Sequence, residues 1–218
     1  MGCCGMIDFD LYFITDRHLS KKGIVDDVIS AIRGGVRIVQ YREKEKSTRE
    51  MIKEAREIGK ICKQKNVVFI VDDRVDVALA SGADGVHIGD DDIDFMTARK
   101  ILGDSKIIGV SVRSLEDAKK YEELGADYIS FGPIFKTKTK KDAGEPIGLD
   151  IIRQAKANLK IPFAVIGGIN RENLKDVLNA GAERVCMISA IAGKNNVEEE
   201  VRILREMIKN YVKFSNNN

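Results

Sequence analysis

Residues 125–132 read GADYISFG, in which a glycine is followed by a short apolar run. The glycine suits the left-handed position at the end of a helix, and the run has the length of a buried strand. The same junction recurs at three other places in the chain: GGVRIVQ (34–40), GADGVHIG (82–89) and GAERVCMI (181–188). A repeated helix-to-strand junction predicts alternating helices and strands, the arrangement from which parallel sheets are built.

Four more apolar runs complete the set of predicted strands: LYFIT (11–15), VVFIVD (67–72), KIIGVSV (106–112) and PFAVIGG (162–168). Helical patterns occupy the intervals and the C-terminal region: 24–33, 48–65, 75–81, 93–102, 115–124, 149–158, 171–180 and 197–212. Ser47 and Asn170 predict two of the helix starts. Strict alternation within 218 residues favours closure into a single (β/α)8 TIM barrel over an open doubly wound sheet, because the runs are apolar on both faces.

These boundaries predict one domain. We expect a flexible N-terminus over residues 1–10, a TIM-barrel domain over 11–212 and a disordered tail over 213–218, where the chain ends in three asparagines. No segment within residues 11–212 has the composition of an interdomain linker.

The composition of the whole chain narrows the function classes. Its 36 Lys and Arg residues and 34 Asp and Glu residues give a net charge of +2, whereas a dedicated nucleic-acid-binding protein is usually strongly basic. No apolar run approaches the length of a membrane span, and we recognise no signal peptide. Cys3, Cys4, Cys62 and Cys186 lack C-x-x-C spacing, which favours reduced thiols in a cytoplasmic protein. The sequence is compatible with a homo-oligomer but does not predict one.

In a barrel of this kind, the active site forms at the carboxyl ends of the strands. QYREK follows the second predicted strand, and alternation places Gln40, Arg42 and Lys44 on the same side. Asp73 and Asp92 follow the third and fourth strands, so they are placed to share one Mg²⁺ ion. Arg42 and Lys44 suit phosphate oxygens. The strand ends therefore predict a site for an anion held by cationic side chains and a metal.

The most basic stretch of the chain is FGPIFKTKTKKDAGEP (131–146). Residues 134–146 exceed the usual connection of about 2–6 residues between a strand and its helix, so we expect a mobile lid that closes over bound ligands. Backbone N–H groups after the seventh and eighth strands, at Gly167–Gly168 and Ile188–Ser189, match the phosphate site common in such barrels.

Each signal also has a structural explanation. Asp90 and Asp91 fit a helix N-cap, and His87 within a strand fits a hydrogen-bonded core residue better than a catalyst. The REK segment fits a surface ion-pair set, the lysine run a solvated loop and the glycine pair a tight turn. Their convergence on one face of a barrel favours the functional interpretation.

Taken in order, the strand-end strings resemble the thiamine phosphate synthase family: YFITD, VQYREK, DDR, GVHIGDDD, GVSVRS, SFGPIFKTKTKKD, IGGIN and MISAI. The resemblance covers about residues 11 to 192, and QYREK together with FGPIFKTKTKKD carries it most specifically. It implies a Mg²⁺-dependent transferase of thiamine biosynthesis that couples hydroxymethylpyrimidine diphosphate to a thiazole phosphate and releases pyrophosphate.

The resemblance also implies roles for individual residues. Those that would bind the pyrimidine diphosphate are Gln40, Arg42, Lys44, Asp72, Ser111 and Lys140, with Tyr41 and Glu43 also in the substrate-binding set. Those that would bind the thiazole phosphate are Thr137, Thr139, Gly168, Ile188 and Ser189. Asp73 and Asp92 would be the metal ligands. Arg42, Lys44, Ser111 and Lys140 would be catalytic, drawing off pyrophosphate to leave a pyrimidine methylene cation that the thiazole nitrogen attacks. Lys136, Lys138 and Lys141 would stay solvated.

One position departs from the family, which typically has Asn where this chain has Asp72. The carboxylate would pair with Arg74 or Lys44, or contact the metal through water, and we favour the contact through water. Two other functions stay open: a thiazole tautomerase, which depends on a histidine where this chain has Arg113, and a catalytically inactive thiamine-pathway binding protein. The intact acidic and lysine-rich elements argue against both.

Overall fold

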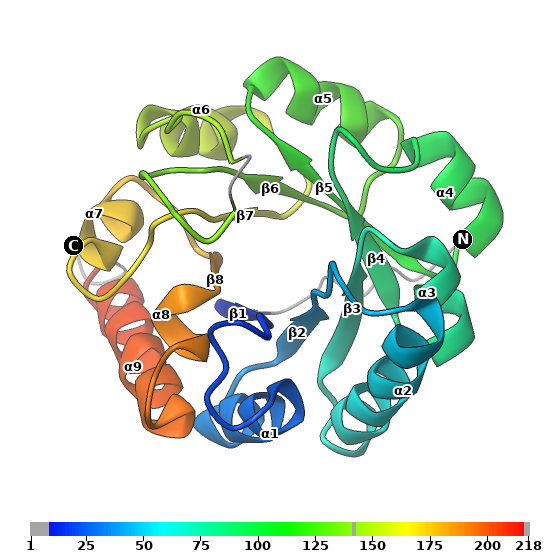
Figure 1. Ribbon diagram of the computed structural model, residues 1–218. Helices are drawn as coiled ribbons and strands as arrows, with labels where there is room; N and C mark the ends of the chain where they lie inside the picture. The colour runs from blue at the N-terminus through cyan, green and yellow to red at the C-terminus, as the bar shows by residue number, and fades with distance from the viewer. Residues whose placement is uncertain (1–8, 141–142, 216–218) are drawn as a thin grey trace.

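A computed structural model describes residues 9–140 and 143–215 as a closed barrel of parallel strands in the order β1 to β8 (Figure 1). The strands are β1 (Leu11–Ile14), β2 (Ile38–Tyr41), β3 (Val68–Asp72), β4 (Gly85–Ile88), β5 (Ile107–Val112), β6 (Tyr128–Phe131), β7 (Phe163–Val165) and β8 (Val185–Met187). β1 pairs with both β2 and β8, which closes the cylinder. The predicted TIM barrel is confirmed.

Helices surround the barrel and connect its strands. They are α1 (Ile24–Gly34), α2 (Thr48–Gln64), α3 (Val75–Ser81), α4 (Phe95–Leu102), α5 (Leu115–Glu123), α6 (Asp150–Asn158), α7 (Leu174–Asn179), α8 (Ser189–Ala192) and α9 (Val197–Ser215). The short α8, which directly follows β8, was not expected from the sequence. α9 packs beside α1 and completes the outer ring (Figure 1).

The helix ends explain the glycine junctions and correct some expected starts. Gly35 caps α1 in the left-handed conformation, with φ of 106°, as the sequence predicts. Ser47 forms a capping box with Glu50 at the start of α2, also as predicted. α4 is capped by Asp94 rather than by Asp90 or Asp91, because those two lie in the preceding turn. α7 begins at Leu174, later than expected, since Asn170 caps a turn before the helix instead, accepting a bond from the N–H of Glu172.

The apolar core has two layers. The larger lies between the strands and the helices. The smaller fills the barrel interior with side chains that include Tyr12, Ile38, Ile70 and Tyr128. Phe9 closes this interior at the amino ends of the strands. Its ring lies edge-on to Tyr12, with a centroid distance of 5.5 Å.

Two residues before the predicted domain start belong to the fold, and α9 runs past its predicted end. Phe9 is buried, and the neighbouring Asp10 accepts hydrogen bonds from Arg205 on α9, so these two residues belong to the fold. α9 continues to Ser215 because residues 213–215 include no helix-breaking Gly or Pro. The rest of both expected flexible ends, 1–8 and 216–218, lies outside the described residues.

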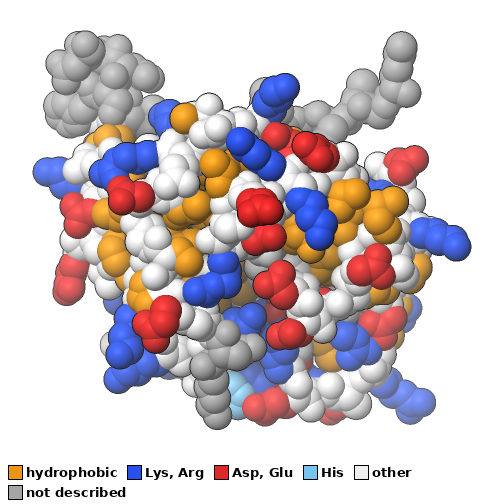
Figure 2. All heavy atoms as spheres, turned by 90° about the horizontal axis from the view of Figure 1, so that it is seen from above, with side chains coloured by type: hydrophobic (Ala, Val, Ile, Leu, Met, Phe, Trp, Pro, Cys, Tyr) orange, Lys and Arg blue, Asp and Glu red, His pale blue; other side chains and the backbone are white. Residues whose placement is uncertain are grey.

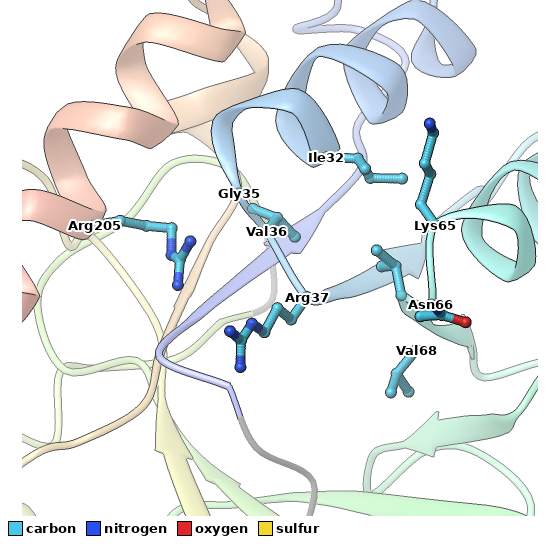
Figure 3. A pocket seen from close by; sticks show the side chains of 9 residues that line it. Ile32, Gly35, Val36, Arg37, Lys65, Asn66, Val68 and Arg205 are labelled. Atoms are coloured by element: carbon cyan, nitrogen blue, oxygen red, sulfur yellow. The ribbon is translucent and has the colours of Figure 1, made fainter.

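Three further features are the length and polarity of the helices, the surface charge and one cavity. Within the described residues, every helix is too short or too polar to cross a bilayer. Acidic and basic side chains are interspersed over the face shown in Figure 2, which agrees with the nearly balanced net charge. A cavity of about 680 Å³ opens near the N-terminal ends of β2 and β3, between residues that include Arg37, Lys65 and Arg205 (Figure 3). It lies at the opposite end of the barrel from the predicted site.

Candidate active site

Arg42 is positioned by the end of β1. Its backbone N–H donates to the buried hydroxyl of Thr15 at 3.0 Å, and its guanidinium Nη1 lies 3.3 Å from Asp16 Oδ2. The other Asp16 oxygen accepts from the N–H groups of His18 and Leu19, which fixes the carboxylate in its turn. Asp16 was not assigned a role from the sequence. Its signal was a carboxylate that directly follows the first strand, beside QYREK.

Two cationic side chains after β2 meet two carboxylates at the end of β3. The Lys44 ammonium contacts the Asp73 carboxylate and lies 3.3 Å from Asp72 Oδ2, while Arg42 Nε lies 3.6 Å from the same oxygen. Burial raises the pKa of Asp72, and the charges of Lys44 and Arg42 oppose that rise. Of the two ion-pair partners expected for Asp72, Lys44 is present. Arg74 instead pairs with Asp76 at 2.5 Å.

The acidic side chain after β4 approaches the same mouth. Asp92 Oδ2 accepts the N–H of Gly89 at 2.7 Å, which holds the carboxylate over the end of the strand. Burial lowers the pKa of His87; the negative charge of Asp92 opposes this and the positive charge of Lys140 adds to it, so both charged groups act on this histidine. Asp92 and Lys140 come from loops 48 residues apart, and the fold brings them to one end of the barrel.

The donor set suits a hard cation, although it does not enclose one. Within the described residues, His, Cys, Asp and Glu side chains do not gather in groups of three that could hold a metal ion. Mg²⁺ commonly uses only one or two carboxylates together with water and substrate phosphates, so Asp73 and Asp92 fit its chemistry. The Lys44 ammonium against Asp73 indicates that positive charge is accommodated here.

Inside the barrel, near the carboxyl ends of the strands, polar side chains form a continuous chain of hydrogen bonds. Gln40 Nε2 donates to the Tyr12 hydroxyl at 3.1 Å, and Tyr12 bonds to Tyr128 at 3.0 Å. The Tyr128 hydroxyl lies 2.9 Å from His87 Nδ1, and His87 Nε2 lies 2.9 Å from Ser111 Oγ. Burial lowers the pKa of His87 to about 4, so its imidazole is neutral near pH 7. His87 is therefore the hydrogen-bonded interior residue that the sequence favoured.

Two members of the expected substrate-binding set direct their side chains elsewhere. Tyr41 faces the helix layer, where its hydroxyl donates to Glu54 on α2 at 2.8 Å. Glu43 folds back into its own loop, and its Oε1 accepts the N–H groups of Lys44 and Glu45 at 2.9 and 2.8 Å. Their neighbours Gln40, Arg42 and Lys44 face the barrel mouth, as alternation predicts.

The lysine-rich loop is anchored at both ends. Near its start, the Ile134 and Phe135 N–H groups donate to carbonyls that follow β7, at 2.8 and 3.0 Å. Near its end, the Arg113 guanidinium donates to the carbonyls of Ala143 and Glu145 at 2.7 and 2.6 Å. Arg113, at the tautomerase histidine position, thus holds the loop instead.

Side chains in the loop alternate in exposure. Thr137 and Thr139 are partly buried, while Lys136, Lys138 and Lys140 are exposed. Among the described lysines of this loop, the charge of Lys140 acts on His87. Lys141, expected to be solvated, lies outside the described residues.

The glycine pair after β7 lets the loop approach closely. Gly167 and Gly168 have φ angles of 104° and 66°, which favour glycine. A Cβ on Gly167 would collide with Pro133, and one on Gly168 would lie 2.6 Å from the Lys136 carbonyl oxygen. After the neighbouring strand β8, Ile188 is partly buried and Ser189 is exposed at the start of α8. The end of β7 therefore borders the threonine-containing loop, and the end of β8 lies beside β7.

Comparisons with known proteins agree with this geometry. A family model described as thiamine monophosphate synthase matches residues 11–191. The chain belongs to this family. It is 52% identical over 202 residues to a thiamine-phosphate synthase of Methanosarcina barkeri, covering 93% of this chain and 91% of the relative. It is 45% identical over 209 residues to a thiamine-phosphate synthase of Chloroflexus aurantiacus, covering 95% and 96%.

A solved structure extends the comparison to three dimensions. The thiamine phosphate pyrophosphorylase from Pyrococcus furiosus superposes with a TM-score of 0.86 at 39% identity, covering 93% of this chain and 96% of that one. The protein is therefore an enzyme of the thiamine monophosphate synthase family, a transferase of thiamine biosynthesis, as the resemblance implied. These relatives give no support to the tautomerase or to an inactive binding protein.

Proposed function

We propose that this enzyme couples hydroxymethylpyrimidine diphosphate with thiazole phosphate to give thiamine phosphate and pyrophosphate. The observation that carries the proposal is the cluster of Arg42 and Lys44 with Asp72 and Asp73 at the barrel mouth. Cations bind the oxygens of a diphosphate, and carboxylates retain a cation beside it. On binding, Lys44 exchanges its contact with Asp73 for one with the diphosphate.

Magnesium would be held by Asp73 and Asp92, two carboxylates on adjacent strand ends. When bound, the ion offsets the charge of the departing pyrophosphate. Arg42, oriented by Asp16, and Lys44 place fixed positive charge where that negative charge develops. Asp72, as the counter-ion of both cations, keeps them at the mouth before substrate binds.

The second substrate would sit between the lysine-rich loop and the last two strand ends. Thr137 and Thr139 offer hydroxyl donors, while Gly168, Ile188 and Ser189 offer backbone donors to the thiazole phosphate. The bond between the pyrimidine methylene and the diphosphate oxygen breaks, with the electron pair leaving on pyrophosphate. The thiazole nitrogen then supplies the pair for the new carbon–nitrogen bond.

This chemistry needs no general base, because the thiazole nitrogen carries no proton to remove. The chain's contribution is to position two substrates and to stabilise leaving-group charge. Every residue named comes from one chain, so the proposal does not require a homo-oligomer. We place the enzyme in the cytoplasm, since the buried Cys62 and Cys186 are free thiols.

The test is pyrophosphate release from the two substrates, with and without Mg²⁺. We expect release only when both substrates and the metal are present. Conversion of the thiazole carboxylate phosphate alone, without pyrophosphate release from the substrate pair, would instead assign the tautomerase function. Failure of both reactions, together with tight thiamine phosphate binding, would assign a binding protein.

A further inference from the structure

The hydrogen-bonded chain in the barrel interior joins two residues of the proposed site. It begins at Gln40 on β2 and ends at Ser111 on β5, after passing through Tyr12, Tyr128 and His87. The four members other than Ser111 are each less than a tenth exposed. Within the described residues, the buried side-chain atoms left without a partner all lie outside this chain.

Gly109 on β5 has no side chain, and this makes the hydrogen-bonded chain possible. Gly109 is paired with His87 on β4 and with Tyr128 on β6, so it lies between them in the sheet. A Cβ at this position would collide with the Tyr128 ring. Because Gly109 leaves this space open, Tyr128 and His87 meet across β5 and stack at a centroid distance of 5.4 Å.

The order of protons along the chain follows from its first donor. Each hydroxyl has one proton to give, and a neutral imidazole has one N–H and one acceptor nitrogen. The Gln40 amide donates to Tyr12, so Tyr12 gives its own proton to Tyr128, and Tyr128 gives its proton to His87 Nδ1. The proton of His87 then lies on Nε2 and is donated to Ser111. The Ser111 hydroxyl proton is consequently left for the site.

The reverse order would present the opposite group to substrate. If the Gln40 amide turned over, every proton would shift and Ser111 would donate to His87, leaving only lone pairs for the site. A mixed order would leave a buried donor or acceptor unsatisfied, at a cost of about 1–3 kcal/mol. Diphosphate oxygens only accept hydrogen bonds, so the order that begins with the Gln40 amide as donor is the one that suits them.

We infer that Tyr128, acting through His87, is a positioning residue that keeps Ser111 a hydrogen-bond donor to the diphosphate, with Tyr12 and Gln40 fixing the direction. This inference rests on the proposed function for its substrate. The direction of the chain, however, is a property of the protein without ligand, so it is measured independently of activity.

The first experiment is ¹⁵N NMR of the histidine side chains in the ligand-free enzyme. The protein has two histidines, so the signals that remain in the variant His18→Asn belong to His87. We expect the Nε2–H tautomer in the wild type and a mixture of tautomers in Tyr128→Phe, which loses one hydroxyl and keeps the stacked ring. An Nδ1–H tautomer in the wild type would overturn the inference even if the enzyme is active.

The second experiment asks whether Tyr128 acts through Ser111. Tyr128→Phe should lower kcat about tenfold with little change in KM, because the bond to the leaving pyrophosphate strengthens in the transition state. In a Ser111→Ala background the same substitution should have almost no further effect. Multiplied effects in the double variant would show a merely structural role and overturn the inference. Tyr121→Phe, a matched loss of a hydroxyl on α5, should leave kcat unchanged.

Discussion

The Lys44 ammonium lies 3.3 Å from the Asp72 carboxylate, at the position where the family typically carries an amide. The same ammonium contacts Asp73, so one cation is shared by two consecutive carboxylates. Asp73 adopts a left-handed backbone conformation, with φ of 59°, which turns the chain after β3 and allows both side chains to reach Lys44. Without ligand, the extra carboxylate is neutralised by an ion pair. The favoured contact with metal-bound water stays a prediction.

Replacing Asp72 by asparagine tests this ion pair. Asp72→Asn should lower the KM for the pyrimidine diphosphate several-fold and weaken the dependence on Mg²⁺ concentration, because Lys44 and Arg42 lose a competing anion. Steady-state pyrophosphate release over a Mg²⁺ series measures both effects. The matched control is Asp90→Asn, an exposed aspartate beyond β4. If both quantities are unchanged in Asp72→Asn, the carboxylate has no part in substrate binding.

Asp92→Asn tests the metal assignment. The amide oxygen can still accept the Gly89 N–H, so we expect the barrel to remain folded by circular dichroism. Turnover should fall by two or more orders of magnitude, because an amide is a much weaker ligand for Mg²⁺. Asp91→Asn should retain activity. Coupling by the wild-type enzyme in the presence of excess chelator would refute a catalytic metal.

The lysines of the loop should differ in importance. Lys140→Ala should reduce turnover far more than Lys138→Ala, since the charge of Lys140 acts on His87. Both substitutions remove one exposed lysine, so they are matched in charge and setting. Comparable losses in pyrophosphate release for the two variants would contradict the assignment.

Arg113 should control the order of the same loop. Arg113→Ala removes two hydrogen bonds to the carbonyls of Ala143 and Glu145, so the loop should become more sensitive to limited proteolysis. The KM for thiazole phosphate should rise about tenfold, because ordering the loop then opposes binding. Arg153→Ala on the surface of α6 is the control. Unchanged cleavage and unchanged KM would mean that the other anchor, near Ile134, is sufficient.

The burial of His87 predicts that the folded protein loses stability as the pH falls below 6.5. Its folded-state pKa is about 4, below the ordinary value of 6.5, so the unfolded chain binds this proton at higher pH than the folded chain. The stabilisation is complete above pH 6.5 and is lost as the pH falls towards 4, by about 3 kcal/mol in total. In His87→Asn, the melting temperature should depend less on pH within this window. His18→Asn, which changes an exposed histidine, should retain the wild-type slope.

The barrel, and the side of the QYREK segment that faces its mouth, could be predicted from the sequence alone. The glycine junctions and apolar runs depend on local backbone preference and burial, which neighbouring residues report directly. Alternation along QYREK placed Gln40, Arg42 and Lys44 on the side that the structure confirms. The same alternation put Tyr41 and Glu43 on the other side, and the family pattern alone had brought them into the binding set.

The partners of these residues follow from the three-dimensional fold and could not be predicted from the sequence. Alternation states which way a side chain points, whereas the residue opposite it depends on the register between strands around the closed barrel. The chain from Gln40 to Ser111 draws on five strands and requires the space left by Gly109, so no local pattern indicates it. Asp16 beside Arg42, and Arg113 beneath the lysine-rich loop, likewise meet their partners across 26 or more residues of sequence.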